Sequence, residues 1–253
     1  MGLKRHDHIS TTGKAWHEYR LDGLHVPGVT AILDKTLAKP ELVDWAARMV
    51  AAAAADEETW YSFDELQRMP ERIKREAADR GHRVHARAAA FLHGIDPGEA
   101  DDDIAGNWAA FLDWYDTVRP EPIQVEFSCA NRTWQVAGTV DLAAVIGGRR
   151  LLIDFKAGKR VHVDAALQTP AYRHMEVYVT AAGEEAPMAD LELTACQIVH
   201  LRADGRWDAY DVNEDNDTPW KVFQRLTWVY RMLKEAEDGN WLELVQSGEA
   251  VMA

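Results

Sequence analysis

Hydrophobic and polar positions alternate most regularly in the middle of the chain, where two apolar runs, 138–146 and 149–156, flank Gly147-Gly148. Both runs are rich in residues that favour strands. Gly-Gly between such runs predicts a two-residue hairpin turn, because both central positions of the turn need a positive φ. The short turn also fixes the register, so Ile146 faces Arg149 and the pairing continues from there.

In this register Asp141 faces Asp154, and Lys156 lies on the same face one step along the strand. Facing like charges destabilise a sheet, so a bound divalent cation is the simplest compensation. Carboxylates suit Mg²⁺ and Mn²⁺, and a neighbouring lysine equips such a site to attack a phosphodiester. The alternative is a solvated acidic face with an incidental lysine. The opposite face is expected to be core and carries Val140, Leu142, Ala144, Leu151, Ile153 and Phe155.

The first part of the chain predicts a hairpin followed by a helix. Residues 1–14 are polar, and we expect them to be frayed. Residues 15–21 and 24–26 are typical of a hairpin closed by Asp22-Gly23. Residues 41–55 form an Ala-rich amphipathic pattern that predicts a helix.

Helix signals continue as far as residue 118. Ser62 and Glu65 form a capping box, which opens a helix. Pro70 is expected to end that stretch and to start the next helix at its first position, and Gly94 ends this second helix. An acidic loop follows and then a helix over 104–118.

Strand patterns dominate after residue 120. They predict strands over 123–130 and 133–137 before the central hairpin and a helix from about Asp164 after it. An edge hairpin is expected over 191–203 and 206–212. A helix follows over 220–237, with Thr218 as its N-cap and Pro219 at its first position. The last helix either covers the sheet or forms a contact in a homo-oligomer. Residues 241–253 are expected to be a tail.

Together these elements predict one α/β domain over residues 1–253, with a mixed central sheet flanked by helices on both faces. A helical N-terminal extension covers about residues 1–70, the core spans about 71–215, and the C-terminal helix spans about 218–238. The chain is long enough for one sizeable core.

Charge limits the partners that the chain can bind. The formal net charge is −14, which argues against strong nonspecific binding to nucleic acid. Basic residues nevertheless gather near the hairpin, so we expect a localised groove rather than a basic surface. They are Arg68, Arg72, Lys74, Arg75, Arg80, Arg83 and Arg87 on one helix, Arg149 and Arg150 at the turn, and Lys156, Lys159 and Arg160 after it.

Cysteine usage and hydropathy bear on the compartment. Cys129 and Cys196 are far apart and lie within predicted strands, which indicates two buried thiols rather than a disulfide. No apolar run is long enough to span a bilayer, and no leader pattern opens the chain. We therefore expect a cytoplasmic protein that does not bind membranes.

The sequence Gly138-Thr-Val-Asp141, a hairpin, and Ile153-Asp-Phe-Lys156 resembles the metal-binding core of the PD-(D/E)XK nuclease superfamily. It is most similar to the branch that contains the RecB nuclease domain, CRISPR-associated RecB-like nucleases and phage exonucleases. The resemblance covers residues 75–180 well. It implies a restriction-endonuclease-like fold and a metal-dependent DNA exonuclease of phage-type recombination or DNA processing, with a recombination partner protein and, if phage-encoded, a location in the host cytoplasm.

The resemblance also implies a ligand set for Mg²⁺ or Mn²⁺. Asp141, Asp154 and the backbone carbonyl of Phe155 would bind the metal. A Gly-x-x-x-His pattern in this branch matches Gly81 and His85, with His82 as the alternative ligand. A mid-helix glycine such as Gly81 costs ~1 kcal/mol relative to Ala, which suggests close packing or close approach of a ligand. Two cysteines cannot supply the four ligands of the iron–sulfur cluster that several RecB-like nucleases carry, so none is expected.

Further roles follow from the same resemblance. Lys156 would orient or deprotonate the attacking water or stabilise the transition state, and burial beside a cation is expected to lower its pKa. One metal ion is expected, since a second would need Glu126, which is given a supporting role. Gln168 would position the lysine or the DNA backbone. Residues assigned to substrate contact are Tyr172, Lys159, Arg160, Arg83 and Lys35.

Two alternatives stay open at this point. An endonuclease with the same fold would carry the same motifs, because the shape of the channel selects strand ends. A non-catalytic protein that binds DNA ends or a partner protein could also retain the fold, although the intact set of Asp141, Asp154 and Lys156 argues against it.

Overall fold

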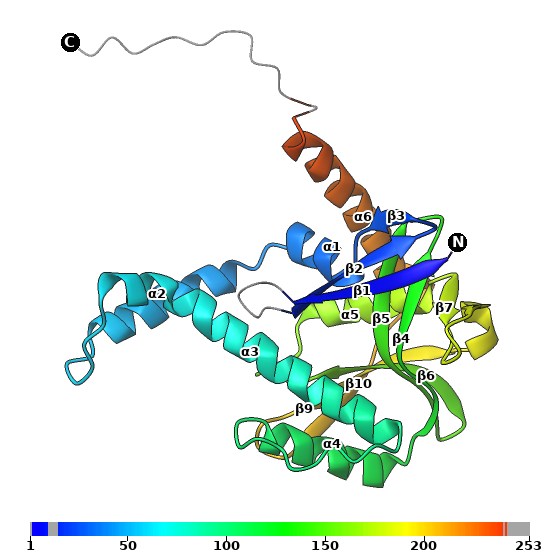
Figure 1. Cartoon of the computed structure of the whole chain (residues 1–253), viewed down its shortest axis with the longest axis horizontal. Coiled ribbons are helices and arrows are strands. Elements are labelled where there is room, and N and C mark those ends of the chain that lie inside the picture. The colour runs from blue at the N-terminus through cyan, green and yellow to red at the C-terminus, as the bar shows by residue number, and fades with distance from the viewer. Residues whose placement is uncertain (1, 10–14, 240, 242–253) are drawn as a thin grey trace.

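The computed structural model describes residues 2–9, 15–239 and 241, and it is organised around a mixed seven-stranded sheet (Figure 1). The strand order is β10-β9-β6-β5-β4-β7-β8, and β6 and β9 are the one parallel pair among the described strands. The strands are β4 (Glu121–Asn131), β5 (Val136–Ile146), β6 (Arg149–Lys156), β7 (Val177–Val179), β8 (Glu185–Pro187), β9 (Ala195–Leu201) and β10 (Trp207–Asp211). The predicted mixed α/β architecture is therefore confirmed, but the N-terminal extension expected to be helical over about residues 1–70 also contains a three-stranded sheet.

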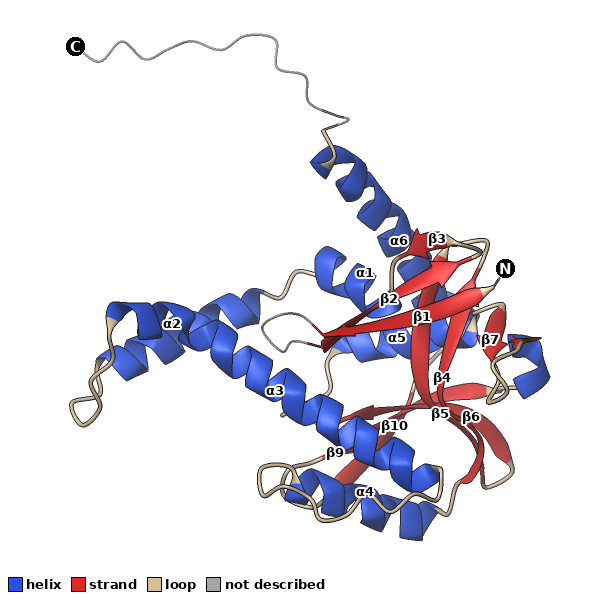
Figure 2. Ribbon diagram, viewed as in Figure 1, coloured by secondary structure: helices blue, strands red, loops and turns tan. Residues whose placement is uncertain are grey.

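Helices cover both faces of this sheet (Figure 2). The described helices are α1 (Val29–Thr36), α2 (Pro40–Ala54), α3 (Phe63–Leu92), α4 (Ala105–Val118), α5 (Val163–Arg173) and α6 (Thr218–Glu237), with short 3₁₀ turns at Met188–Leu191 and Asp215–Asp217. Helix α2 packs against α3 and contributes no residue to the cores of the sheet. One core lies between the sheet and α3 and α4, and the other lies between the sheet and α1, α5 and α6. No described helix has the length and apolar composition to cross a membrane.

A small second sheet packs against the first. Its strands are β1 (Leu3–Ile9), β2 (Ala15–Leu21) and β3 (Leu24–Val26), in that order. The predicted hairpin at Asp22-Gly23 is confirmed, with φ values of 52° and 90°. The expectation that residues 1–14 are frayed is wrong for 3–9, because β2 supplies a partner for that strand and Leu3 is buried against Tyr19 and Leu21.

The register of the central hairpin is as predicted for most of its length. The ladder runs from Ile146↔Arg149 to Leu142↔Ile153. The next pair, Asp141 with Asp154, does not form, because β5 and β6 separate there. A side chain replaces the ladder at this point, since Asp141 Oδ2 accepts the Phe155 N–H at 2.8 Å.

The sheet bends where the two strands separate. Pairing between β4 and β5 skips Glu126, which has a φ of 45°, a region that non-glycine residues rarely adopt. Val140 on one side of the bend belongs to the core under α5, whereas Leu142 on the other side belongs to the core under α3 and α4. The expectation that Val140 shares one apolar face with Leu142 and Ile153 is therefore wrong.

Several other boundaries differ from the sequence-based expectation. Pro70 lies inside one continuous helix, α3, which starts at the predicted capping box and ends before Gly94. The helix tolerates the loss of one backbone donor at Pro70. Helix α6 begins at Thr218 with Asp217 as its N-cap, one residue earlier than predicted. The predicted edge hairpin places only β10 at the edge, because β9 pairs with β6.

Other predictions are confirmed. The helix expected over 41–55 forms as α2, although none of its residues is buried, and the helix over 104–118 forms as α4. Both cysteines are free and buried. The predicted tail over 241–253 lies outside the described residues except for Trp241.

Two glycines on the site elements have opposite surroundings. A Cβ at Gly138 would lie 2.3 Å from Tyr172 Cε1, so the absence of a side chain lets the tyrosine ring cross β5. No atom lies within 4 Å of a Cβ at Gly81, so the expected close packing there is not found.

This contrast predicts opposite effects of the same substitution. Gly138→Ala should lower the free energy of unfolding by about 1–3 kcal/mol through overpacking against Tyr172. Gly81→Ala, in an open helical position, should raise it by about 0.5–1 kcal/mol. Urea unfolding of the two variants measures both changes. Equal effects of the two substitutions would contradict the packing described for Gly138.

Candidate active site

The predicted site residues converge where α3, β5, β6 and α5 meet. His85 on α3 points its Nδ1 at Asp141 Oδ1, 3.0 Å away. Asp141 Oδ2 accepts the Phe155 N–H, so both carboxylate oxygens have partners. His82 is exposed, so His85, and not the alternative His82, lies against the acidic residue.

A second chain of contacts runs from Asp154 to α5. Lys156 Nζ lies 2.7 Å from Asp154 Oδ2 and donates to Gln168 Oε1 at 3.0 Å. Gln168 Nε2 in turn donates to the Tyr172 hydroxyl at 3.0 Å. Asp154 Oδ2 is buried and lacks a hydrogen bond of acceptable geometry within the described residues, so its charge is compensated mainly by the ion pair with Lys156.

The contacts from Asp154 to Tyr172 change the expected role of Tyr172. Its side chain is buried and lies over Gly138, where substrate cannot reach it directly. Burial raises the pKa of Tyr172 well above its usual value, so the hydroxyl stays protonated. Tyr172 therefore positions Gln168, which in turn positions Lys156. Its buried side chain does not offer the substrate contact that was predicted for it.

Burial and opposite charges compete in setting the protonation of the cluster. Burial is the largest influence on His85 and opposes its charged form, but the charge and hydrogen bond of Asp141 together with the charge of Asp154 outweigh burial and raise the pKa of His85. Burial likewise disfavours ionised Asp141, but the charge and hydrogen bond of His85 prevail and lower the pKa of Asp141. Burial raises the pKa of Asp154, since the opposing charge of Lys156 does not fully offset it.

The lowering of the Lys156 pKa was expected beside a bound metal ion and stays a prediction for that state, whereas the side chains alone shift this pKa in the other direction. Burial does disfavour the ammonium, but the charges of Asp154 and Asp141 outweigh burial and raise its pKa. Lys156 is therefore a cation at neutral pH, and a protonated amine cannot accept a proton from water.

The cluster fits a divalent cation in its donor chemistry but not in its present geometry. Carboxylates, an imidazole and a backbone carbonyl are suitable donors, and Asp154 has an oxygen without a hydrogen bond. However, no group of three or more His, Cys, Asp or Glu side chains is arranged to hold a metal within the part of the chain that the structure describes. A cation would have to displace His85 or the Phe155 N–H from Asp141, and Lys156 from Asp154.

Glu126 faces a different partner. Its Oε1 accepts from Arg5 Nη1 at 3.1 Å, and Arg5 also donates to Thr139. Glu126 thereby links the bend in β4 to the small sheet. Glu126 was predicted to support the metal site, but its described side-chain partner is Arg5 and not Asp141 or Asp154.

The predicted DNA-contacting cations differ in availability. Arg83 pairs with Asp79, Asp101 and Asp103, and Lys35 pairs with Glu237. These two charges are therefore neutralised within the chain.

Lys159 and Arg160 are exposed in the turn that follows Lys156. Arg160 has one distant carboxylate, Glu41 Oε1, 3.8 Å away. These two side chains are the available basic groups next to the cluster.

Two residues outside the predicted set contact this turn. Asn107 and His200 are both buried and donate to the carbonyls of Ala157 and Gly158. The sequence signal was a polar residue in an otherwise apolar helix or strand pattern, which does not indicate a partner by itself.

Comparison of the sequence with models of known protein families finds no match. Comparison with curated proteins finds none either.

The pKa shifts predict a pH window for the His85–Asp141 pair. The raised pKa of His85 means that its contribution to stability is complete below about pH 6.5 and is lost as pH rises through the folded-state pKa. The lowered pKa of Asp141 means that its contribution is complete above about pH 3.8 and is lost as pH falls through the folded-state pKa.

The difference in unfolding free energy between wild type and His85→Gln should therefore be largest between about pH 4 and 6.5 and should shrink toward pH 9. Urea unfolding across this range measures it. A difference that is constant or that grows above pH 7 would contradict the charged pair.

Proposed function

We propose that the protein is a metal-dependent deoxyribonuclease that hydrolyses phosphodiester bonds. The observation that carries this proposal is a cluster in which buried Asp154 lies with half-buried Asp141 and Lys156 beside an exposed basic turn. Buried carboxylates with perturbed pKa values and a charged lysine are rare in purely structural cores and are typical of functional sites.

Asp141, Asp154, His85 and the Phe155 carbonyl would hold Mg²⁺ or Mn²⁺. Such an ion, when bound, polarises a phosphoryl oxygen and acidifies a water. Lys156 is held by Gln168 beside the two carboxylates, and of the roles open to it we propose electrostatic stabilisation of the charge that develops on the phosphoryl group rather than proton abstraction. Gln168 orients the Lys156 amine, and Tyr172 orients Gln168.

The resemblance to the RecB-like and phage exonuclease branch favours an exonuclease that acts in recombination or DNA processing, with a recombination protein as partner. An endonuclease of the same fold and a non-catalytic DNA-end-binding protein are the alternatives. The net charge of −14 is consistent with binding that depends on the few cations near the cluster.

Cleavage of three substrates separates these functions. End-labelled linear duplex, single strand and closed circular DNA are incubated with Mg²⁺, Mn²⁺ or EDTA. Wild type should shorten linear DNA only with a divalent ion, and Lys156→Ala should lower the rate about 10²–10³-fold, as expected for loss of an electrostatic group.

Lys4→Ala, which removes an exposed lysine on β1, is the matched control and should retain the wild-type rate. Cutting of the circle would identify an endonuclease. Absence of cleavage on every substrate, with wild-type thermal stability in all three proteins, would refute the proposed activity and favour the non-catalytic alternative.

Metal binding has a readout that does not depend on activity. Mn²⁺ at about 100 times its Kd should stabilise the fold by about 2.7 kcal/mol, which corresponds to a rise in Tm of about 5–10 °C for a chain of this size. Asp154→Asn should abolish the shift, whereas Asp102→Asn in the exposed acidic loop should preserve it. Differential scanning calorimetry measures both. An equal shift in the two variants would place the ion elsewhere.

A further inference from the structure

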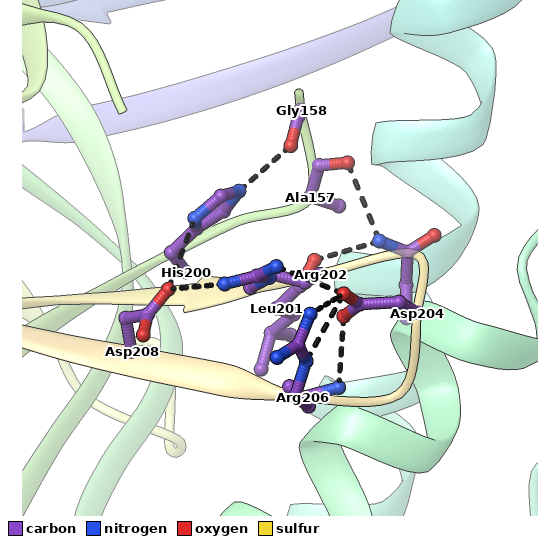
Figure 3. A network of polar contacts seen from close by, with 9 residues as sticks. Ala157, Gly158, His200, Leu201, Arg202, Asp204, Arg206 and Asp208 are labelled. Atoms are coloured by element: carbon purple, nitrogen blue, oxygen red, sulfur yellow. Dashed lines mark hydrogen bonds and ion pairs between the residues drawn. The ribbon is translucent and has the colours of Figure 1, made fainter. Parts of the chain in front are cut away.

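The turn that follows Lys156 accepts hydrogen bonds from two buried side chains (Figure 3). Its first two carbonyls, those of Ala157 and Gly158, point inward and accept hydrogen bonds from Asn107 on α4 and His200 on β9. The next two side chains, Lys159 and Arg160, are exposed. The backbone of the turn is therefore anchored while its cations remain available.

His200 is placed by the parallel pairing of β6 with β9, in which it is the register partner of Lys156. Its ring is 7% exposed, and Nε2 lies 2.8 Å from the Gly158 carbonyl oxygen. A carbonyl can only accept, so Nε2 carries the proton. The other nitrogen, Nδ1, lies 3.8 Å from Asp208 Oδ2, which is too long for a hydrogen bond.

Asn107 joins the ends of the same two strands. Its Nδ2 donates to Leu201 O at 2.6 Å and to Ala157 O at 3.4 Å, and the side chain is 5% exposed. Gly106 allows this approach, since a Cβ there would lie 1.9 Å from Ala203 O. Helix α4 thus lies close enough to the β9–β10 turn for Asn107 to reach both carbonyls.

The basic turn has few contacts of its own that would fix it. Arg160 Nε reaches His162 Nε2 at 3.3 Å, and its carboxylate partner Glu41 is 3.8 Å away and half-exposed. An exposed pair of this kind contributes little to holding the turn. The hydrogen bonds from His200 and Asn107 come from buried residues and connect the turn to the sheet.

We propose that His200 and Asn107 are positioning residues that fix the turn so that Lys159 and Arg160 meet the phosphate groups of a nucleic-acid strand. The proposal rests on the proposed nuclease function. A fixed turn binds with a smaller entropic cost than a mobile one, because its backbone is ordered before the substrate arrives.

The geometry separates this role from the chemical step. Lys156 is held independently by Asp154 and Gln168. Loss of the His200 hydrogen bond should therefore weaken substrate binding while the rate at saturation stays near that of wild type.

The first test measures the turn directly. Trypsin cleavage after Lys159 and Arg160, followed by mass spectrometry, should be at least about 10-fold faster in His200→Leu than in wild type, a ratio that corresponds to about 1.4 kcal/mol. His200→Gln retains a donor and should stay close to wild type. Cleavage after the exposed Arg206 is the internal control for global unfolding. Unchanged cleavage of the turn in His200→Leu would overturn the proposal, whether or not the protein cuts DNA.

The second test measures function. His200→Leu should raise KM for DNA about 10-fold and change kcat less than about 2-fold, and His200→Gln should restore KM. In a Lys159→Ala/Arg160→Ala background, where KM is already raised, His200→Leu should add no further increase, because the three residues act as one unit.

The outcomes separate the two proposals. Absence of cleavage by wild type would count against the nuclease and leave the trypsin result to decide on the anchored turn. A fall in kcat with unchanged KM, or a full additional effect in the double-alanine background, would show that His200 acts on the cluster and not through Lys159 and Arg160.

Discussion

Two carboxylates where the sheet bends, buried Asp154 and half-buried Asp141, are the constraint on which the surrounding structure depends. Burial disfavours the charged form of both Asp141 and Asp154, so each must be compensated. Asp141 is compensated by contacts with His85 on α3 and with the Phe155 N–H, and Asp154 is compensated by its ion pair with Lys156. The compensation is complete for Asp141 and incomplete for Asp154, one oxygen of which lacks a hydrogen bond.

This constraint explains features that otherwise look unrelated. The ladder between β5 and β6 stops at Leu142, which frees the Asp141 side chain to take the place of a backbone acceptor. Glu126 adopts a positive φ next to the same bend. Such local strain is tolerated because packing on both sides over-determines the bend. Incomplete compensation costs stability, as is common where a site is built for a ligand rather than for the fold.

The sequence was sufficient for the local part of this arrangement and insufficient for the non-local part. Gly147-Gly148 determines the turn and thus the register of the hairpin, so the convergence of Asp141, Asp154 and Lys156 could be predicted from residues close together in the chain. The separation of the strands before Asp141 meets Asp154 is a feature of the assembled sheet, in which β6 also pairs with β9 from a distant part of the sequence. Strand β1 was missed because its partner β2 decides its structure. Asn107 and His200 were missed because neither belongs to a motif and both act on carbonyls far along the chain.

The central claim is that the cluster of Asp141, Asp154 and His85 binds a divalent cation beside Lys156. Anomalous diffraction from crystals grown with Mn²⁺ tests it most directly. The account predicts one strong peak about 2 Å from oxygens of both Asp141 and Asp154, with Lys156 moved away from Asp154 but still bonded to Gln168. A protein that diffracts well with saturating Mn²⁺ and shows no peak there, with the Lys156–Asp154 ion pair intact, would contradict it.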